Sequence, residues 1–109
     1  MIVGIPDSSL KEWLSDKAYV VASDEGEAVA IAAGRYLGSG LTATVFMSAD
    51  GFCNALNPLT SLIIPYEIPV NWVIGVRTDT PQHEVMGRTI EQLIELYGLK
   101  ETGSVEIIR

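Results

Sequence analysis

Three short β-prone runs, each apolar on both faces, restrict the fold of this chain more than any other feature. They are residues 18–22 (AYVVA), 42–47 (TATVFM) and 70–76 (VNWVIGV). A strand with one face in water alternates apolar with polar residues, whereas a strand covered on both faces is apolar along its length. The runs therefore predict a parallel sheet with helices against both of its faces.

Helical segments separate the predicted strands. Their patterns place helices at residues 6–14, 26–37, roughly 52–63 and 90–96, and one last short strand at residues 104–108. This alternation is typical of an α/β fold with a mainly parallel sheet. No repeat or linker interrupts the 109 residues, so we expect one domain over residues 1–109.

The predicted strands also indicate where a site would lie. Ligands of an open parallel sheet bind beyond the carboxyl ends of its strands. In this chain those ends lead into residues 23–27, 48–54 and 77–87, which we expect to be loops. The side chains of these three segments are the candidates for function.

Charge and composition exclude several classes of protein. Fourteen acidic residues against seven basic ones give a net charge of −7, which disfavours nucleic acid as a partner, because phosphates are bound by Lys and Arg. The single cysteine, Cys53, excludes an internal disulfide and a Cys-based zinc cluster, and we expect it to be buried and unreactive. No apolar run reaches the length of a membrane span and no signal peptide is evident, so we expect a cytoplasmic protein.

Residues 28–34 (AVAIAAG), in the second helical segment, are small and apolar around the whole helix. The mean hydropathy of +0.27 is also high for a short chain. A helix that is apolar all round is buried on all sides. It is either a central core helix or a helix held between the sheet and another subunit, and the second interpretation, which we prefer, predicts an oligomer.

Acidic residues cluster just before this helix. Asp24, Glu25 and Glu27 stand where the preceding strand gives way to it. Acids at a helix N-terminus cap free N–H groups and complement the helix dipole, which explains Asp24 and Glu27. A partly desolvated carboxylate at the end of a strand would instead share a proton near neutral pH. The residues alone leave both interpretations open.

Three blocks resemble one family of enzymes. Residues 25–34 (EGEAVAIAAG) are similar to the segment that carries the catalytic glutamate in the pyrimidine-binding domain of thiamine-diphosphate-dependent enzymes, with Glu25 and Gly34 nine residues apart. Residues 51–62 (GFCNALNPLTSL) resemble phosphonopyruvate decarboxylases and the alpha subunit of sulfopyruvate decarboxylases. Residues 81–88 (PQHEVMGR) resemble the former most closely. The opening Gly4-Ile5-Pro6 also fits the family's early Gly-x-Pro turn, and with it the blocks occur in the same order over nearly the whole chain.

The resemblance implies a fold and a cofactor. The fold is the three-layer α/β sandwich of thiamine-diphosphate-binding domains, with a mainly parallel central sheet, shortened here at both ends. Thiamine diphosphate is the implied cofactor. Glu25 is the implied catalytic residue, hydrogen-bonded to N1′ of the cofactor's aminopyrimidine. Gly51 and Asn54 are implied to line the cofactor site.

The resemblance also implies substrate-binding residues. The substrate would be a small anionic 2-oxo acid that loses CO2. His83, the only histidine, would position it or transfer a proton. Gln82 and Arg77 would help to bind the anion, although a solvated arginine at a strand end is an equally good account of Arg77.

A second domain is implied by what the chain lacks. In the resembled enzymes a Gly-Asp-Gly motif on another domain holds the diphosphate and its Mg²⁺, and this motif does not occur here. No metal ligand is therefore expected in this chain. We expect a pyrophosphate-binding partner domain or subunit, in a homo- or hetero-oligomer.

The sequence leaves three functions open. The preferred one is the pyrimidine-binding half of a decarboxylase most like phosphonopyruvate decarboxylase, which converts 3-phosphonopyruvate to phosphonoacetaldehyde and CO2. The first alternative is the alpha subunit of a sulfopyruvate decarboxylase. The second is a non-catalytic α/β assembly or binding module. This last alternative is favoured by Asp50 and Cys53, which stand where the resembled pattern has Ser and Gly.

Overall fold

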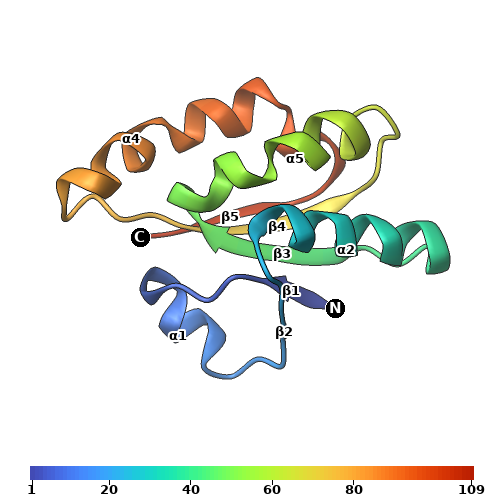
Figure 1. The fold of residues 1–109 in the computed structure, drawn as a ribbon, viewed down its shortest axis with the longest axis horizontal. Helices are drawn as coiled ribbons and strands as arrows, with labels where there is room; N and C mark the ends of the chain where they lie inside the picture. Colours follow the sequence, from blue (N-terminus) through green and yellow to red (C-terminus); the bar gives the residue numbers. More distant parts are fainter.

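The chain forms a five-stranded, all-parallel sheet with helices on both faces (Figure 1). The computed structural model describes residues 1–109. In the order β2-β1-β3-β4-β5 across the sheet, the strands are Val20–Val21, Ile2–Gly4, Ala43–Ser48, Val70–Gly75 and Val105–Ile108. The α/β fold with a parallel sheet is therefore confirmed.

The helices are distributed unequally over the two faces. One face is covered by the 3₁₀ turn η1 and the short helix α1, and the other by all later helical segments (Figure 1). In chain order these segments are η1 (Ser8–Leu10), α1 (Lys11–Leu14), α2 (Glu25–Ser39), η2 (Ala49–Ala55), α3 (Leu56–Pro58), η3 (Leu59–Ile63), α4 (Pro81–Leu96) and α5 (Leu99–Thr102). This division follows from the strand order, because the chain reverses its direction across the sheet after β2.

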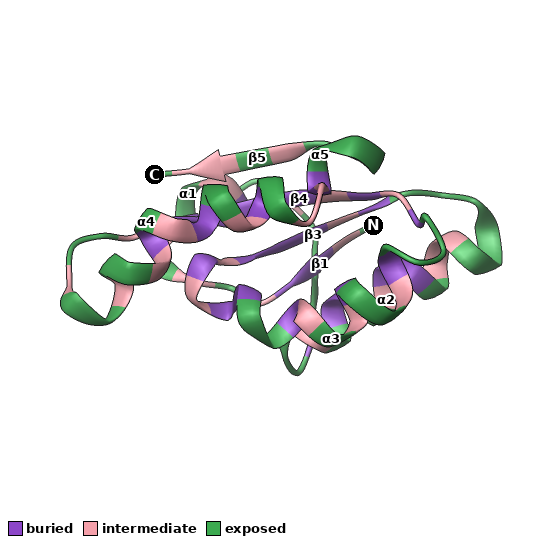
Figure 2. Ribbon diagram, turned by 90° about the horizontal axis from the view of Figure 1, so that it is seen from above, coloured by how far each residue is buried: buried purple, intermediate pink, exposed green.

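The two central strands account for the core. Figure 2 shows β3 and β4 buried beneath the helices, while β5 lies at an edge and is only partly buried. In β4, Trp72 packs in the larger apolar cluster, whereas Val73 belongs to a smaller one with Leu10 and Leu14 on the opposite face. These strands are apolar on both faces, as predicted, because both faces are covered.

Two predictions about strands were wrong. Residues 18–22 form only the edge strand β2, and its Val20 and Val21 are exposed rather than covered. β1 was not predicted at all, although it lies between β2 and β3. Its three residues are too few to show a period, and Gly4 packs so closely on β3 that a Cβ there would overlap the Phe46 carbonyl.

Two predicted loops are helical. α4 begins at Pro81, so the predicted loop 77–87 is mostly helix and His83 lies in its first turn. Pro at the first position of a helix is a start signal, and Gly87 does not interrupt this helix. Instead Gly87 allows close packing, since a Cβ there would lie 2.5 Å from the Arg77 carbonyl oxygen. Residues 48–54 likewise enter the 3₁₀ segment η2, in which Cys53 is exposed, not buried as expected.

Within the chain, α2 is buried on one face only. Its buried residues are Ala28, Val29, Ala32 and Ala33. Ala30 and Gly34 on the outer face are exposed, and no atom lies within 4 Å of the position that a Gly34 Cβ would take. A subunit covering this outer face stays a prediction. None of the helices is long and apolar enough to cross a bilayer.

The exposure of Gly34 has a measurable consequence. Replacing Gly34 by Ala is expected to raise the free energy of unfolding of the isolated chain by about 0.5–1 kcal/mol, because alanine favours the helix and meets no neighbour. Urea unfolding followed by circular dichroism measures this change. A loss of stability in the Gly34→Ala chain would contradict an open outer face of α2.

Candidate functional site

The candidate side chains gather at the carboxyl edge of the sheet. Parallel strands all end at the same edge, so the segments that follow β2, β3 and β4 meet there. Glu25 follows β2, Gly51 and Asn54 lie in η2 after β3, and His83 lies in the first turn of α4 after β4. Residues up to 58 positions apart in the sequence are thereby brought to one edge.

Glu25 takes no part in capping α2, whereas the neighbouring Asp24 and Glu27 do. Asp24 is the N-cap of α2, and its carboxylate accepts a hydrogen bond of 2.7 Å from the Glu27 amide. Glu27 Oε1 accepts one of 2.8 Å from the Ser23 amide. This reciprocal arrangement resembles a capping box. The capping interpretation of Asp24 and Glu27 is therefore confirmed, and it leaves the carboxylate of Glu25 for another purpose.

The carboxylate of Glu25 faces η2. Its Oε1 accepts a hydrogen bond of 3.0 Å from Asn54 Nδ2. Its Oε2 occupies the place where a side chain on residue 51 would stand, since a Cβ on Gly51 would overlap it. The structure shows no hydrogen bond from the protein to Oε2. Three residues predicted for one site thus lie together, with one carboxylate oxygen held and the other available.

The contribution of the Asp24 cap to stability can be measured by mutation without changing Glu25. Asp24→Ala is expected to lower the free energy of unfolding by about 0.5–2 kcal/mol, because it leaves the Glu27 amide without its acceptor. The midpoint of urea unfolding measures the loss. An unchanged midpoint would show that this cap contributes nothing to stability.

His83 makes a contact that the sequence analysis missed. Its Nδ1 lies 2.5 Å from Asp50 Oδ2, and the two side chains are 20% and 31% exposed. Asp50 was noted only as a departure from the resembled pattern. The two residues are 33 positions apart, so no local pattern could pair them. The available signal was that each follows one of two adjacent strands.

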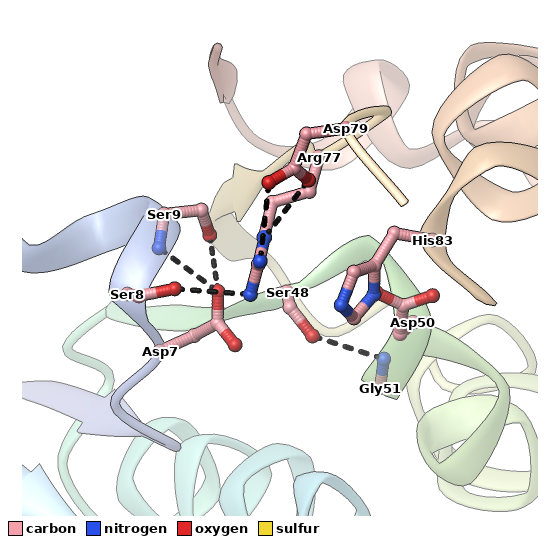
Figure 3. A network of polar contacts seen from close by, with 9 residues as sticks. All are labelled: Asp7, Ser8, Ser9, Ser48, Asp50, Gly51, Arg77, Asp79 and His83. Atoms are coloured by element: carbon pink, nitrogen blue, oxygen red, sulfur yellow. Dashed lines mark hydrogen bonds and ion pairs between the residues drawn. The ribbon is translucent and has the colours of Figure 1, made fainter. Parts of the chain in front are cut away.

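Arg77 is engaged by neighbouring side chains (Figure 3). Its Nε and one terminal nitrogen each lie 3.3 Å from a carboxylate oxygen of Asp79, and the other terminal nitrogen donates to Ser8 Oγ at 3.1 Å. The hydrogen bond between them raises the pKa of Arg77 and lowers that of Asp79. An anion at Arg77 would therefore compete with Asp79.

The segment after β1 also reaches this edge and was not predicted to do so. Asp7 Oδ2 accepts hydrogen bonds from the Ser9 amide at 3.0 Å and the Ser9 hydroxyl at 2.5 Å, which caps η1. Ser8, beside them, contacts Arg77. Gln82 precedes His83 in the first turn of α4, where its side chain is exposed and makes no hydrogen bond.

No group of three or more His, Cys, Asp or Glu side chains is arranged to hold a metal ion. The charged side chains at this edge pair with one another instead. Asp50 pairs with His83, and Asp79 pairs with Arg77. The arrangement thus offers one carboxylate with a free oxygen, one imidazole and one guanidinium, which suit proton transfer and anion binding.

Comparison with known proteins relates this chain to a type of enzyme. Phosphonopyruvate decarboxylase of Streptomyces viridochromogenes is 39% identical over 106 residues, which cover 87% of this chain and 26% of that enzyme. Sulfopyruvate decarboxylase subunit alpha of Methanocaldococcus jannaschii is 34% identical over 105 residues, covering 87% of this chain and 62% of the subunit. The chain is a homologue of these decarboxylases. No family model matches its sequence.

A solved structure supports the fold. The crystal structure of a candidate thiamin diphosphate-dependent enzyme from Mycobacterium smegmatis superposes with a TM-score of 0.70 at 20% identity, over 97% of this chain and 27% of that chain. The resemblance in fold stated from the sequence is therefore confirmed. The chain itself matches only a part of each decarboxylase relative. It spans 26% of the Streptomyces enzyme and 62% of the Methanocaldococcus subunit.

Proposed function

We propose that the chain is the pyrimidine-binding part of a thiamine-diphosphate-dependent 2-oxo acid decarboxylase that acts on 3-phosphonopyruvate. The observation that carries this proposal is the carboxylate of Glu25, which begins α2 after β2, accepts a hydrogen bond from Asn54 and packs against Gly51. The 39% identity to a phosphonopyruvate decarboxylase supports the choice of substrate.

The residues at this edge fit the aminopyrimidine end of the cofactor. Glu25 Oε2 accepts no hydrogen bond from the protein, and the absence of a side chain at Gly51 leaves room for this oxygen. Asn54 holds the other carboxylate oxygen and so fixes the plane of the group. When bound, thiamine diphosphate supplies the electron sink that decarboxylation of a 2-oxo acid requires.

The protein's own groups would orient the reactants and move protons. Glu25 would hold or release a proton at Oε2, while Asn54 keeps that oxygen directed at the ring nitrogen it serves. His83 would exchange a proton with the substrate. Arg77 would attract the phosphonate, with Asp79 giving way as the anion arrives.

The rest of the active site would come from a partner. We propose that a pyrophosphate-binding domain or subunit holds the diphosphate and Mg²⁺, in a homo- or hetero-oligomer in the cytoplasm. Two observations support a partner. The chain has no grouped metal ligands, and its relatives are either longer enzymes or named as subunits.

A sulfopyruvate decarboxylase alpha subunit is the second candidate. The observation that favours it is that two such subunits, including that of Methanococcus maripaludis, match 62% of their own length. A sulfonate and a phosphonate present similar anionic oxygens to Arg77. The substrate assay must therefore include both 2-oxo acids.

Reconstitution tests the function. The chain would be combined with a pyrophosphate-binding protein that carries a Gly-Asp-Gly motif, thiamine diphosphate and Mg²⁺. Aldehyde formation would then be followed with 3-phosphonopyruvate and with 3-sulfopyruvate. We expect faster turnover of 3-phosphonopyruvate and no turnover by the chain alone. Preference for 3-sulfopyruvate would favour the second candidate. Stable assembly without cofactor binding or turnover would favour a non-catalytic module.

A further inference from the structure

The contact between Asp50 and His83 joins two fixed segments. Asp50 stands in the first turn of η2, between the buried residues Ala49 and Gly51. The Ser48 hydroxyl caps this turn by accepting from the Gly51 amide at 3.2 Å. His83 stands in the first turn of α4, where its amide donates to the Thr80 carbonyl at 3.1 Å. Neither side chain is carried by a free loop, so their separation of 2.5 Å is built into the fold.

The chemistry of the two groups assigns the hydrogen between them. An ionised carboxylate can only accept hydrogen bonds, so an imidazole nitrogen this close to it must carry the hydrogen. In a neutral imidazole the other nitrogen then has a free lone pair. The hydrogen-bond partner of Nδ1 thus decides which ring nitrogen carries the hydrogen.

The remaining ring nitrogen is directed towards the other candidate residues. Figure 3 shows the far edge of the His83 ring turned from Asp50 towards the side on which Ser48 and Arg77 lie. No hydrogen bond from the protein to Nε2 is present. Through the backbone, Asp50 is also joined to Gly51, which packs against Glu25. The first turn of η2 therefore contacts both His83 and Glu25, the two side chains proposed to move protons.

We propose that Asp50 is a positioning residue, which holds the imidazole of His83 in the Nδ1-protonated tautomer and presents Nε2 to the substrate. The catalytic part of this inference rests on the proposed function, whereas the tautomer does not. Asp50 stands where the resembled enzymes have Ser, so it is a feature of this chain and is not carried over from them.

Spectroscopy of the chain tests the tautomer without any substrate. Because His83 is the only histidine, a ¹⁵N-labelled chain gives one imidazole, whose two nitrogen shifts distinguish the tautomers once the ring is neutral. We expect a protonated Nδ1 and an unprotonated Nε2. In Asp50→Ala the ring should populate both tautomers. A protonated Nε2 in the unmodified chain, or an unchanged tautomer in Asp50→Ala, would overturn the proposal.

Kinetics of the assembled enzyme test the catalytic part. Asp50→Ala is expected to lower kcat by about 10–100-fold, as the loss of an orienting partner commonly does, with a much smaller change in KM. The matched control is Glu84→Gln, which removes the carboxylate next to His83 on α4 that pairs with Arg88. It should leave both kcat and the tautomer unchanged. An equal loss in Glu84→Gln would indicate a general charge effect and overturn the proposal.

Failure of the two proposals can be told apart. If Asp50→Ala does not fold, Asp50→Ser, with a side chain one bond shorter, gives the same comparison. An assembled enzyme that turns over neither 2-oxo acid would refute the proposed function, and the nitrogen shifts would still decide whether Asp50 orients His83. A normal kcat in a folded Asp50 variant would refute the positioning role alone.

Discussion

Replacing Glu25 by Gln is expected to lower the kcat of the assembled decarboxylase by about 10²–10⁴-fold, the usual contribution of a positioned acid–base group. The substitution keeps the shape of the side chain, and the amide oxygen can still accept the hydrogen bond from Asn54. What it removes is the oxygen at Oε2 that holds or releases a proton. Steady-state turnover of 3-phosphonopyruvate at saturating thiamine diphosphate measures the effect.

Glu27→Gln is the matched control for this experiment. It makes the same change of charge two residues along the same helix, but the carboxylate of Glu27 accepts from the Ser23 amide and does not face η2. We expect a small loss of stability and an unchanged kcat. Full activity in Glu25→Gln, or an equal loss in both variants, would remove Glu25 from its proposed role.

Gly51→Ala is expected to lower kcat/KM roughly 10²-fold, the scale of effect that follows when reacting groups are displaced by about 1 Å. The added Cβ would overlap Oε2 of Glu25 and lie 2.6 Å from its Cδ. Either the carboxylate rotates away from the cofactor or η2 moves outward. Titration of the assembled protein with thiamine diphosphate, together with turnover, would separate weaker binding from slower chemistry.

The control for the added methyl group is Gly38→Ala in the assembled protein, because Gly38 lies on α2 beyond the apolar segment 28–34 and its Cβ would meet no atom within 4 Å. Both substitutions replace a glycine by alanine, yet only the one at Gly51 places a Cβ against Glu25. Thermal unfolding of Gly51→Ala should show a folded chain. If it retains normal kcat/KM, Gly51 is not needed for the approach to Glu25, and the fit of the cofactor proposed here would have to be withdrawn.

The fold was predictable where a segment was long and covered on both sides. β3 and β4 are six-residue strands, and their continuous apolar runs reflect helices on both faces. β1 has only three residues, so it shows no period, and its position beside β3 depends on the contact of Gly4 with Phe46. The start of α4 at Pro81 was missed because residues 77–87 were predicted to form a loop. Within the helix, Gly87 allows close packing on Arg77.

The site was predictable only in part, for a related reason. Glu25 was named only through the family resemblance, because the residues alone left the capping and proton-sharing interpretations of the acidic cluster open. The structure then showed that Asp24 and Glu27 are used in capping. The role of Asp50 could not be seen, because its partner His83 lies 33 residues away. The engagement of Arg77 by Asp79 was also not foreseen, although the two are close in sequence, since it depends on how the chain turns after β4.

By itself the sequence determined the alternation of strands and helices, the parallel sheet and the edge at which most of the candidate side chains gather. Apolar periodicity and helix capping are local properties, and a chain displays them without being folded. The tertiary structure alone decided which polar groups meet at that edge. The contacts of Glu25 with Asn54 and of Asp50 with His83 join segments 29 and 33 residues apart, and only the packing of α2 and α4 on adjacent strands brings those side chains within hydrogen-bonding distance.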